Sequence, residues 1–264
     1  MKRRTFLTTS TAGLSASCVD GLMNHSSGNT VTNTETNKSV HGYDYRRPES
    51  FHGTKLLFQG DSITDMKWGR NQADRNHYLG HSYVYLIASR LMMDMPEADL
   101  TFLNRGISGN AVGDLKSRWI KDAVELDPDV LSILVGVNDV GRAVRANSKV
   151  DVVRFESDYR SILQQSRERN ADLKIILLEP FVLSVTRVKD AWDAWRGQTD
   201  RIRPIVERLA EEFEAIFLNT QDLFDHATTQ ADPSHWIWDG VHPLPQGHEL
   251  IARHWIEAVA TEWG

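Results

Sequence analysis

Short apolar runs alternate with longer segments whose apolar residues recur at helical spacing along most of the chain. The compact runs predict buried strands over 55–59, 100–104, 130–135, 173–178 and 215–219. Apolar stripes predict helices over 80–93, 112–126, 152–170, 191–213 and 245–263. The second of these helices would turn inward Leu115, Trp119, Ile120 and Val124. Strands that alternate with helices favour an α/β fold, a three-layer α/β/α sandwich around a central five-stranded parallel sheet.

The N-terminal segment lacks this pattern. A basic start from Lys2 to Arg4 precedes Phe6, Leu7 and a mildly apolar stretch rich in Ser, Thr and Ala. Paired arginines followed by Phe-Leu resemble a twin-arginine export signal. We therefore predict an export signal over residues 1–22 and a periplasmic or secreted protein. A basic, disordered tail of a cytoplasmic protein is the alternative.

Cys18 is the only cysteine of the chain and follows three small residues. This arrangement resembles a lipoprotein cleavage site, although Leu14 lies one position further from the cysteine than is typical. Lipid anchoring through Cys18 and cleavage nearby with an incidental cysteine both remain open. Residues 23–42 are rich in Ser, Thr and Asn, which predicts a flexible linker. Residues 43–264 are then expected to form one domain.

Composition excludes several classes of protein. Hydrophobic residues make up 41% and charged residues 25% of the 264 residues, which is ordinary for a globular protein. The formal net charge of -6 gives no reason to expect a nucleic-acid partner. No apolar run reaches the length of a transmembrane helix. One cysteine and no HExxH pattern predict neither a metal site nor another cofactor.

Polar motifs follow three predicted strands or precede the last helix. Ser62 lies in GDSITD after the first strand, and Gly109 lies in NRGISGN after the second. Asn138 follows the third strand in GVND, and Asp239 and His242 share the loop WDGVHP. Each motif alone is as well explained by a turn or a helix cap. Because all of them fall at one predicted edge of the sheet, together they predict a site with a nucleophile, a base, an orienting carboxylate and oxyanion donors.

The same motifs resemble the conserved blocks of the SGNH/GDSL hydrolases, from about Lys55 to Trp263. The resemblance implies the flavodoxin-like fold of that family. It also implies Ser62 as nucleophile, His242 as general base and Asp239 as its partner. The N–H groups of Ser62 and Gly109 and the side chain of Asn138 would form the oxyanion hole. GDSI replaces GDSL just after the nucleophile, a change that should leave the chemistry intact.

The residues of several motifs resemble most closely those of an acetyl-xylooligosaccharide esterase branch of this family. FQGDSITD, NRGISGNAVGDLKSRW, GVNDV and WDGVHP carry this likeness. It implies a serine esterase that removes small acyl groups, acetyl above all, from carbohydrate. The GxSxG elbow of α/β-hydrolases is absent around Ser62, so that fold is disfavoured.

Two other functions remain open at this point. One is a lipid or aryl esterase, such as a lysophospholipase, and the other is a carbohydrate-binding protein without catalysis. Tryptophans that could stack on sugars occur at positions 68, 192, 195, 236 and 238. The sequence leaves open whether the chain forms a homo-oligomer.

Overall fold

The computed structural model describes Arg47, Pro48 and residues 50–264. The predicted export signal over 1–22, Cys18 and the predicted linker over 23–42 lie outside the described residues and stay predictions. The same holds for the first residues of the domain expected over 43–264.

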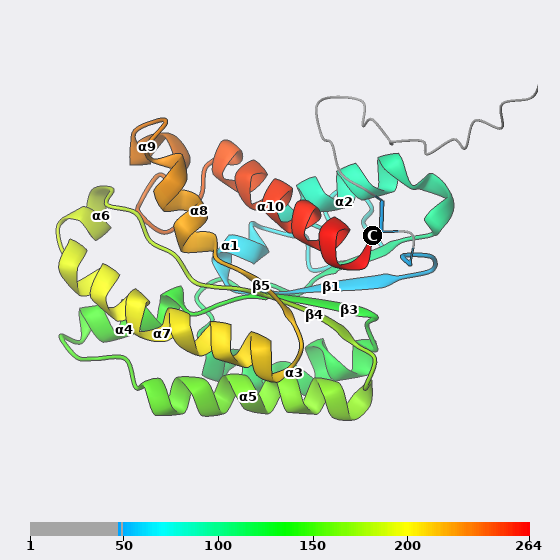
Figure 1. The fold of residues 1–264 in the computed structure, drawn as a ribbon, viewed down its shortest axis with the longest axis horizontal. Coiled ribbons are helices and arrows are strands. Elements are labelled where there is room, and N and C mark those ends of the chain that lie inside the picture. Colours follow the sequence, from blue (N-terminus) through cyan, green and yellow to red (C-terminus); the bar gives the residue numbers. More distant parts are fainter. Residues whose placement is uncertain (1–46, 49) are drawn as a thin grey trace, which may run out of the picture. The chain divides into compact units, whose positions relative to one another are not determined.

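Five parallel strands form one sheet in the order β2-β1-β3-β4-β5. Figure 1 shows this sheet between its two layers of helices. Their bounds are β1 Lys55–Gly60, β2 Thr101–Asn104, β3 Val130–Leu134, β4 Lys174–Leu178 and β5 Ile216–Leu218. This is the flavodoxin-like order. The structure therefore confirms the predicted α/β sandwich with a five-stranded parallel sheet.

Helices cover both faces of the sheet. One face carries α2 (Tyr83–Asp94) and α10 (Pro245–Trp263), and the opposite face carries α3 (Val112–Asp122), α5 (Val152–Arg169) and α7 (Trp192–Glu212). Shorter helices lie in the connections: α1 Ser62–Asp65, η1 Pro96–Ala98, η2 Val124–Leu126, α4 Val137–Arg145, α6 Thr186–Lys189, α8 Thr220–Ala227 and α9 Pro233–Trp236. None of the described helices is long and apolar enough to cross a membrane.

Part of the core is an aromatic cluster around Phe58 of β1. Phe58 packs against Tyr83 of α2, Phe102 of β2 and Trp255 of α10, with ring centroids 5.5 to 6.2 Å apart. The buried indole N–H of Trp255 donates to Ser132 Oγ over 3.1 Å. A fully buried aromatic cluster whose polar atom has a partner stabilises this layer without an orphaned donor.

The prediction for the second helix was wrong in two respects. Ile120 is 51% exposed rather than inward, and the helix ends at Asp122 before the short η2. Five residues after Leu115, a side chain points about 140° away around the helix. The buried stripe is carried instead by Val112, Leu115 and Trp119.

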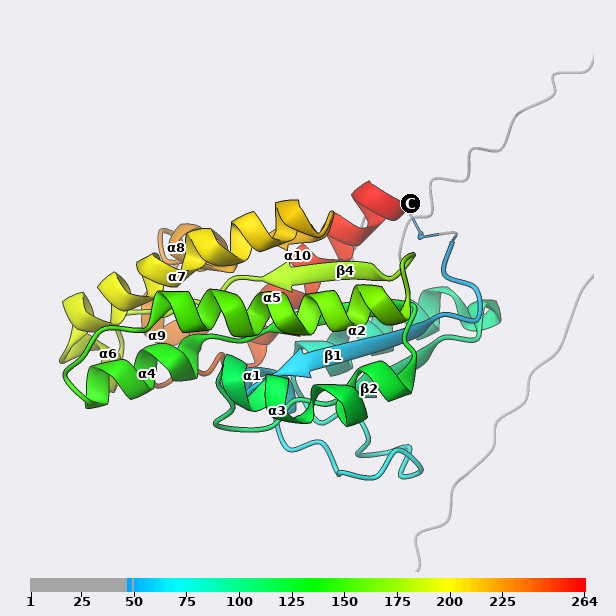
Figure 2. The same cartoon turned by 90° about the horizontal axis from the view of Figure 1, so that it is seen from below.

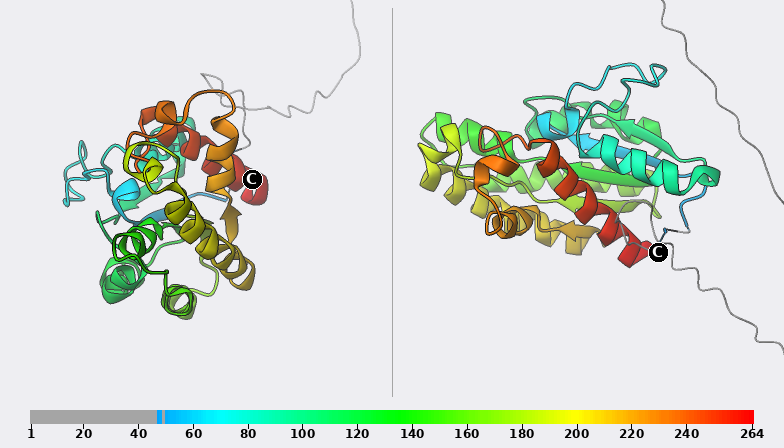
Figure 3. Two further views of the ribbon diagram at one scale, coloured as in Figure 1. Left: turned by 90° about the vertical axis from the view of Figure 1, so that its left-hand side faces the viewer. Right: turned by 90° about the horizontal axis from the view of Figure 1, so that it is seen from above.

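The strands end at one edge, where the candidate site must lie. Figure 2 shows the arrowheads of β1 and β4 pointing to the side that carries α1, α4, α6 and α9, and Figure 3 (left) looks onto this edge. Gly60 is the last residue of β1, and a Cβ there would collide with the Leu134 carbonyl and Thr64 Oγ1. Only glycine lets the chain turn so sharply from β1 into α1.

His248 of α10 is buried against the start of α2 and gives the fold a dependence on pH. Its Nδ1 accepts the Tyr83 N–H over 3.2 Å, and burial lowers the pKa of His248 from 6.5 to about 3. The unfolded chain therefore binds this proton at a higher pH than the folded protein does. Its contribution to stability is complete above about pH 6.5 and is lost as the pH falls toward 3.

We expect replacing His248 by Gln to flatten this dependence. Between pH 7 and pH 5, His248 alone should cost the wild-type protein about 2 kcal/mol of unfolding free energy. Burial raises the pKa of Asp61 to about 7 and that of Asp139 to about 6, so these carboxyls act in the opposite direction. The comparison of the two proteins by urea denaturation isolates the histidine. Equal pH slopes in wild type and variant would contradict the assignment.

Candidate active site

Ser62 is the first residue of α1, directly after β1. Asp61 caps this short helix by accepting the Ile63 N–H over 3.0 Å. The Ser62 hydroxyl faces His242, with 2.7 Å between Oγ and Nε2. The predicted nucleophile and the predicted base, 180 residues apart in the chain, are therefore in direct contact.

Asp239 holds His242 from the other side of its ring. Its Oδ1 accepts the N–H groups of Val241 and His242 over 3.0 and 2.8 Å, and its Oδ2 lies 2.9 Å from His242 Nδ1. Burial alone would raise the pKa of Asp239, but these hydrogen bonds lower it to about 2. An ionised Asp239 accepts a hydrogen bond from the Nδ1–H of His242, which leaves Nε2 unprotonated and able to accept the Ser62 hydroxyl proton.

Arg187 of α6 is a second partner of Asp239, and no pattern in the sequence predicts it. Its Nη2 lies 2.9 Å from the same Oδ2 that faces His242. The guanidinium is half-exposed, so solvent screens this ion pair. No motif marks the residue, which lies in a helix of only four residues far from Asp239 in the chain.

The two other predicted motifs meet each other beside β1. Gly109 has a φ of 84°, and Asn138 Nδ2 donates to the Asn110 carbonyl over 3.1 Å. The Ile107 N–H donates to the Gly60 carbonyl over 3.0 Å, which joins this loop to the end of β1. Among the described residues, no hydrogen bond links Ser62 directly to Gly109 or Asn138. The loops come together through Gly60.

Two carboxyl groups of the motifs have raised pKa values. Burial raises the pKa of Asp61 to about 7, although the Ile63 N–H and His242 act in the opposite direction. Burial likewise raises the pKa of Asp139 to about 6, against the hydrogen bond from the Val112 N–H. Perturbed carboxyl groups next to a serine-histidine pair are typical of functional sites.

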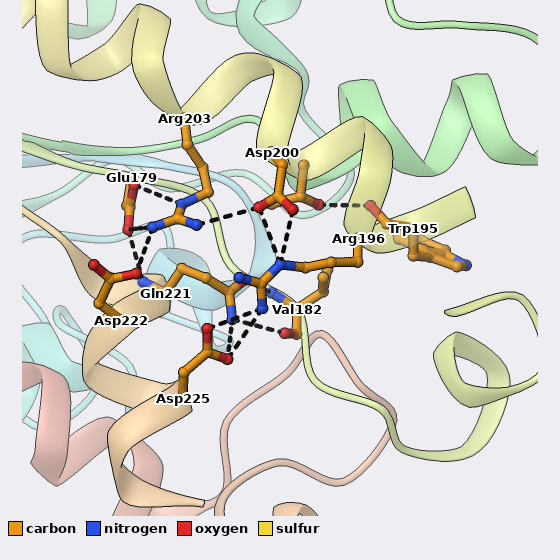
Figure 4. A network of polar contacts seen from close by, with 10 residues as sticks. Glu179, Val182, Trp195, Arg196, Asp200, Arg203, Gln221, Asp222 and Asp225 are labelled. Carbon is orange, nitrogen blue, oxygen red and sulfur yellow. Dashed lines mark hydrogen bonds and ion pairs between the residues drawn. The ribbon is translucent and has the colours of Figure 1, made fainter. Parts of the chain in front are cut away.

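A network of polar side chains supports the loop after β4 (Figure 4). Gln221 of α8 accepts the Val182 N–H over 2.9 Å and donates to the Val182 carbonyl over 3.0 Å. The next residue, Leu183, donates its N–H to the Gly240 carbonyl over 3.0 Å. The loop that carries Asp239 and His242 is thus hydrogen-bonded to the segment after β4. The buried Gln221 in turn holds the backbone N–H and carbonyl of Val182 in that segment.

Glu179 anchors the start of the same segment. Its carboxylate is almost completely buried and accepts two hydrogen bonds from Arg203 of α7, over 2.8 and 3.1 Å. It also accepts the Gln221 N–H over 3.0 Å. Arg203 continues to Asp200 and Asp222, so α7, β4 and α8 are joined by charged groups.

The tryptophans differ in their suitability for binding sugars. Trp68 is buried, and the guanidinium groups of Arg70 and Arg105 lie 4.7 and 5.0 Å from its ring. Trp195 is buried, and Trp192 and Trp236 are half-buried against the core. Trp238 is 59% exposed, and its ring lies 6.2 Å from that of His242. It is the tryptophan of this group that presents an open face beside the site.

The described residues contain no group of three or more His, Cys, Asp or Glu side chains that could hold a metal ion.

Comparisons with known proteins agree with the geometry. Residues 58–250 match the GDSL-like lipase/acylhydrolase family. The chain is 34% identical over 216 residues to an acetylxylan esterase from Geobacillus stearothermophilus, covering 80% of this chain and 96% of that protein. The crystal structure of that esterase superimposes with a TM-score of 0.69 at 33% identity, covering 80% and 96% of the two chains. Structures of its variants described as catalytic mutants replace a serine, an aspartate or a histidine by alanine.

A GDSL-like lipase from Parabacteroides merdae is also similar. Its crystal structure superimposes with a TM-score of 0.75 at 37% identity, covering 80% of this chain and 97% of that chain. The strand order and the helices on both faces are therefore those of known GDSL/SGNH hydrolases.

We expect Glu179→Ala to lower the free energy of unfolding by about 3 kcal/mol, because it leaves the Arg203 charge without its buried partner. The matched control is Arg169→Ala, which removes the exposed ion pair with Asp127 and should cost less than about 1 kcal/mol. Urea denaturation at pH 7 measures both. Equal losses in the two variants would show that the buried pair adds nothing beyond an exposed one.

Proposed function

Because this chain belongs to the GDSL-like lipase/acylhydrolase family, we propose that it removes acetyl groups from carbohydrate, such as acetylated xylo-oligosaccharides. The family and the acetylxylan esterase relative make the chain a carboxylic ester hydrolase. The acetyl group, the sugar and the mechanism are the proposed part. The observation that carries the mechanism is the hydrogen-bonded series from Ser62 through His242 to Asp239, with links of 2.7 and 2.9 Å.

In the proposed first step, Ser62 Oγ attacks the ester carbonyl while His242 Nε2 takes its proton. Asp239 keeps the imidazole oriented and stabilises its charged form. The tetrahedral intermediate then collapses, and the sugar oxygen leaves with the proton from His242. The products of this step are the free sugar hydroxyl and an acetyl-Ser62 enzyme.

In the proposed second step, His242 removes a proton from water as the water oxygen attacks the acetyl carbonyl. Collapse returns the proton to Ser62 Oγ and releases acetic acid. In both steps the negative oxygen would be bound by the N–H groups of Ser62 and Gly109 and by the Asn138 amide. Asn138 has two N–H groups, and one of them already holds the Asn110 carbonyl.

Trp238 supports a carbohydrate as the alcohol part of the substrate. Its open ring beside His242 could stack on a sugar that leaves with the proton from that histidine. Neither the resemblance nor the exposed residues give comparable support for a substrate with a long acyl chain. The alternative of a carbohydrate-binding protein without catalysis has no support once the protein is an esterase.

Export would bring the enzyme to polysaccharide fragments outside the cytoplasm. This part of the proposal depends on residues 1–22, and on Cys18 if the protein is lipid-anchored.

Ser62→Ala should abolish hydrolysis of p-nitrophenyl acetate and of acetylated xylo-oligosaccharides, with the circular dichroism spectrum unchanged. Without Oγ no acyl-enzyme can form, and a loss of at least ~10³-fold in kcat is expected. Wild type should cleave acetyl esters faster than butyryl or octanoyl esters of the same phenol. A folded Ser62→Ala protein with near-normal turnover would overturn the mechanism, and a preference for octanoyl esters would overturn the substrate class.

Trp238→Ala should raise KM for acetylated xylo-oligosaccharides by about fivefold, since one aromatic stacking contact is of the order of 1 kcal/mol. KM for p-nitrophenyl acetate, which carries no sugar, should change less than about twofold. Trp238→Phe keeps an aromatic ring and should recover most of the loss. Equal effects on both substrates would mean that the tryptophan supports the loop rather than the sugar.

A further inference from the structure

The peptide group that joins Ser108 to Gly109 has a neighbouring peptide group on each side, and each of these neighbours is hydrogen-bonded to a charged side chain. On one side, the Ser108 N–H donates to Asp65 Oδ2 over 2.9 Å. On the other, the Gly109 carbonyl accepts a hydrogen bond from Arg142 Nη2 over 2.9 Å. The peptide between them carries the Gly109 N–H, which donates to no described residue.

We propose that Asp65 and Arg142 are positioning residues that fix the direction of the Gly109 N–H for binding the oxyanion. The inference rests on the proposed function, since it assumes that Ser62 performs acyl transfer and that Gly109 is an oxyanion donor.

Gly109 needs such support because it has no side chain to hold it. Its φ of 84° lies in a region that glycine enters freely, and a Cβ there would meet nothing within 4 Å. Packing therefore does not restrict this residue from the side. An oxyanion donor stabilises a transition state only if it is already oriented before the reaction. The orientation must come from the neighbouring peptide groups.

Asp65 holds the peptide before Ser108 from the helix that also carries the nucleophile. It is the last residue of α1, which begins at Ser62, and its carboxylate is buried. Its Oδ2 accepts three hydrogen bonds, from the Ser108 N–H at 2.9 Å, Ser108 Oγ at 2.7 Å and Arg70 Nη2 at 2.6 Å. The oxyanion loop and the nucleophile are thus tied to one short helix.

The residues just before Ser108 are held from the same side. The Gly106 carbonyl accepts hydrogen bonds from Trp68 Nε1 and Arg70 Nη1, both over 2.9 Å. A Cβ at Gly106 would lie 2.5 Å from the Asp65 nitrogen, so the loop backbone touches α1 directly. These contacts make the Asp65 anchor part of a rigid base rather than an isolated bond.

Arg142 holds the other side from α4, the helix that also carries Asn138. Its Nη2 bridges the Gly109 carbonyl at 2.9 Å and Asp114 Oδ2 at 2.6 Å. The same Asp114 oxygen accepts the Ala111 N–H over 2.8 Å. A half-exposed guanidinium is a weak contributor to stability, but here its hydrogen bond fixes one carbonyl direction.

Further contacts from α4 complete this side. Asn138 binds the Asn110 carbonyl over 3.1 Å, and Asp139 accepts the Val112 N–H over 3.2 Å. The loop from Gly109 to Val112 is therefore held at each residue, directly by α4 or through the Asp114–Arg142 pair. Loss of Arg142 would release the Gly109 carbonyl while the later residues stay in place. The expected consequence is a misoriented N–H in an otherwise intact site.

The experiment measures kcat and KM for p-nitrophenyl acetate in Arg142→Gln, Arg142→Lys and Asp65→Asn. We expect Arg142→Gln to lower kcat between about tenfold and a hundredfold, because loss of a whole oxyanion donor costs about 10²–10³-fold and a displaced donor less. KM should stay within about twofold. Arg142→Lys keeps a charged donor and should recover most of kcat. Asp65→Asn weakens the opposite anchor and should also act on kcat.

The matched control is Arg160→Gln on α5, which removes a partly exposed arginine paired with Glu156 and Glu212. It should leave kcat unchanged. The unfolding midpoint of each variant shows whether a fall in kcat reflects loss of folded protein or loss of positioning. If Asp65→Asn does not fold, the kcat of Arg142→Gln alone decides the test. Ser62→Ala separates the two levels of the argument. If it stays active, the proposed function fails, whereas an inactive Ser62→Ala with a normal kcat in Arg142→Gln overturns only this inference.

Two other results would also overturn it. One is an Arg142→Gln effect confined to KM, which would make the arginine a substrate-binding group. The other is a fall in kcat that Arg160→Gln reproduces at the same loss of stability.

Discussion

The close approach of Gly60 to β3 and α1 is the constraint on which the site depends. With no side chain at this residue, β1 pairs with β3 as far as Leu134 and turns at once into the helix of Ser62. The Gly60 carbonyl then receives the Ile107 N–H from the next loop. One residue therefore contacts the third strand, the helix of Ser62 and the loop of Gly109. A Cβ there would collide with the Leu134 carbonyl of β3 and with Thr64 Oγ1 of α1.

In the loops of the site, charged and amide side chains bind the backbone groups that a strand or helix would pair with other backbone groups. Asp239 accepts the backbone N–H groups of Val241 and His242 as well as facing the His242 ring. Asp65 accepts the Ser108 N–H, and Gln221 binds the backbone N–H and carbonyl of Val182. Backbone groups near a buried site must be satisfied, and a loop has no neighbouring strand to do so. The two halves of the site rest on different foundations. The loop of Gly109 is held by α1 and α4, and the Asp-His loop rests on the segment after β4.

Much of the fold followed from local pattern. The five strands were predicted nearly to their ends because a parallel sheet covered on both faces reads as uninterrupted apolar runs. The long helices followed from their stripes, but Ile120 was placed inward since periodicity alone does not mark the edges of a buried face. The short helices α1 and α8 were missed, because one or two turns carry too few residues for a stripe. So was α4, which begins inside the motif of Asn138, where the motif reads equally well as a turn.

The sequence by itself determined the family, the sheet and the residue types of the site, because these are written in short motifs at the ends of apolar runs. Ser62, Asp239 and His242 could be named from them, and their order along the chain already placed them at one edge. Only the tertiary structure decided which side chains hold that arrangement. Arg187 reaches Asp239, Asp65 reaches Ser108 across 43 positions, and Arg142 reaches Gly109 across 33. Such contacts depend on how loops from different strands pack, which no local pattern encodes.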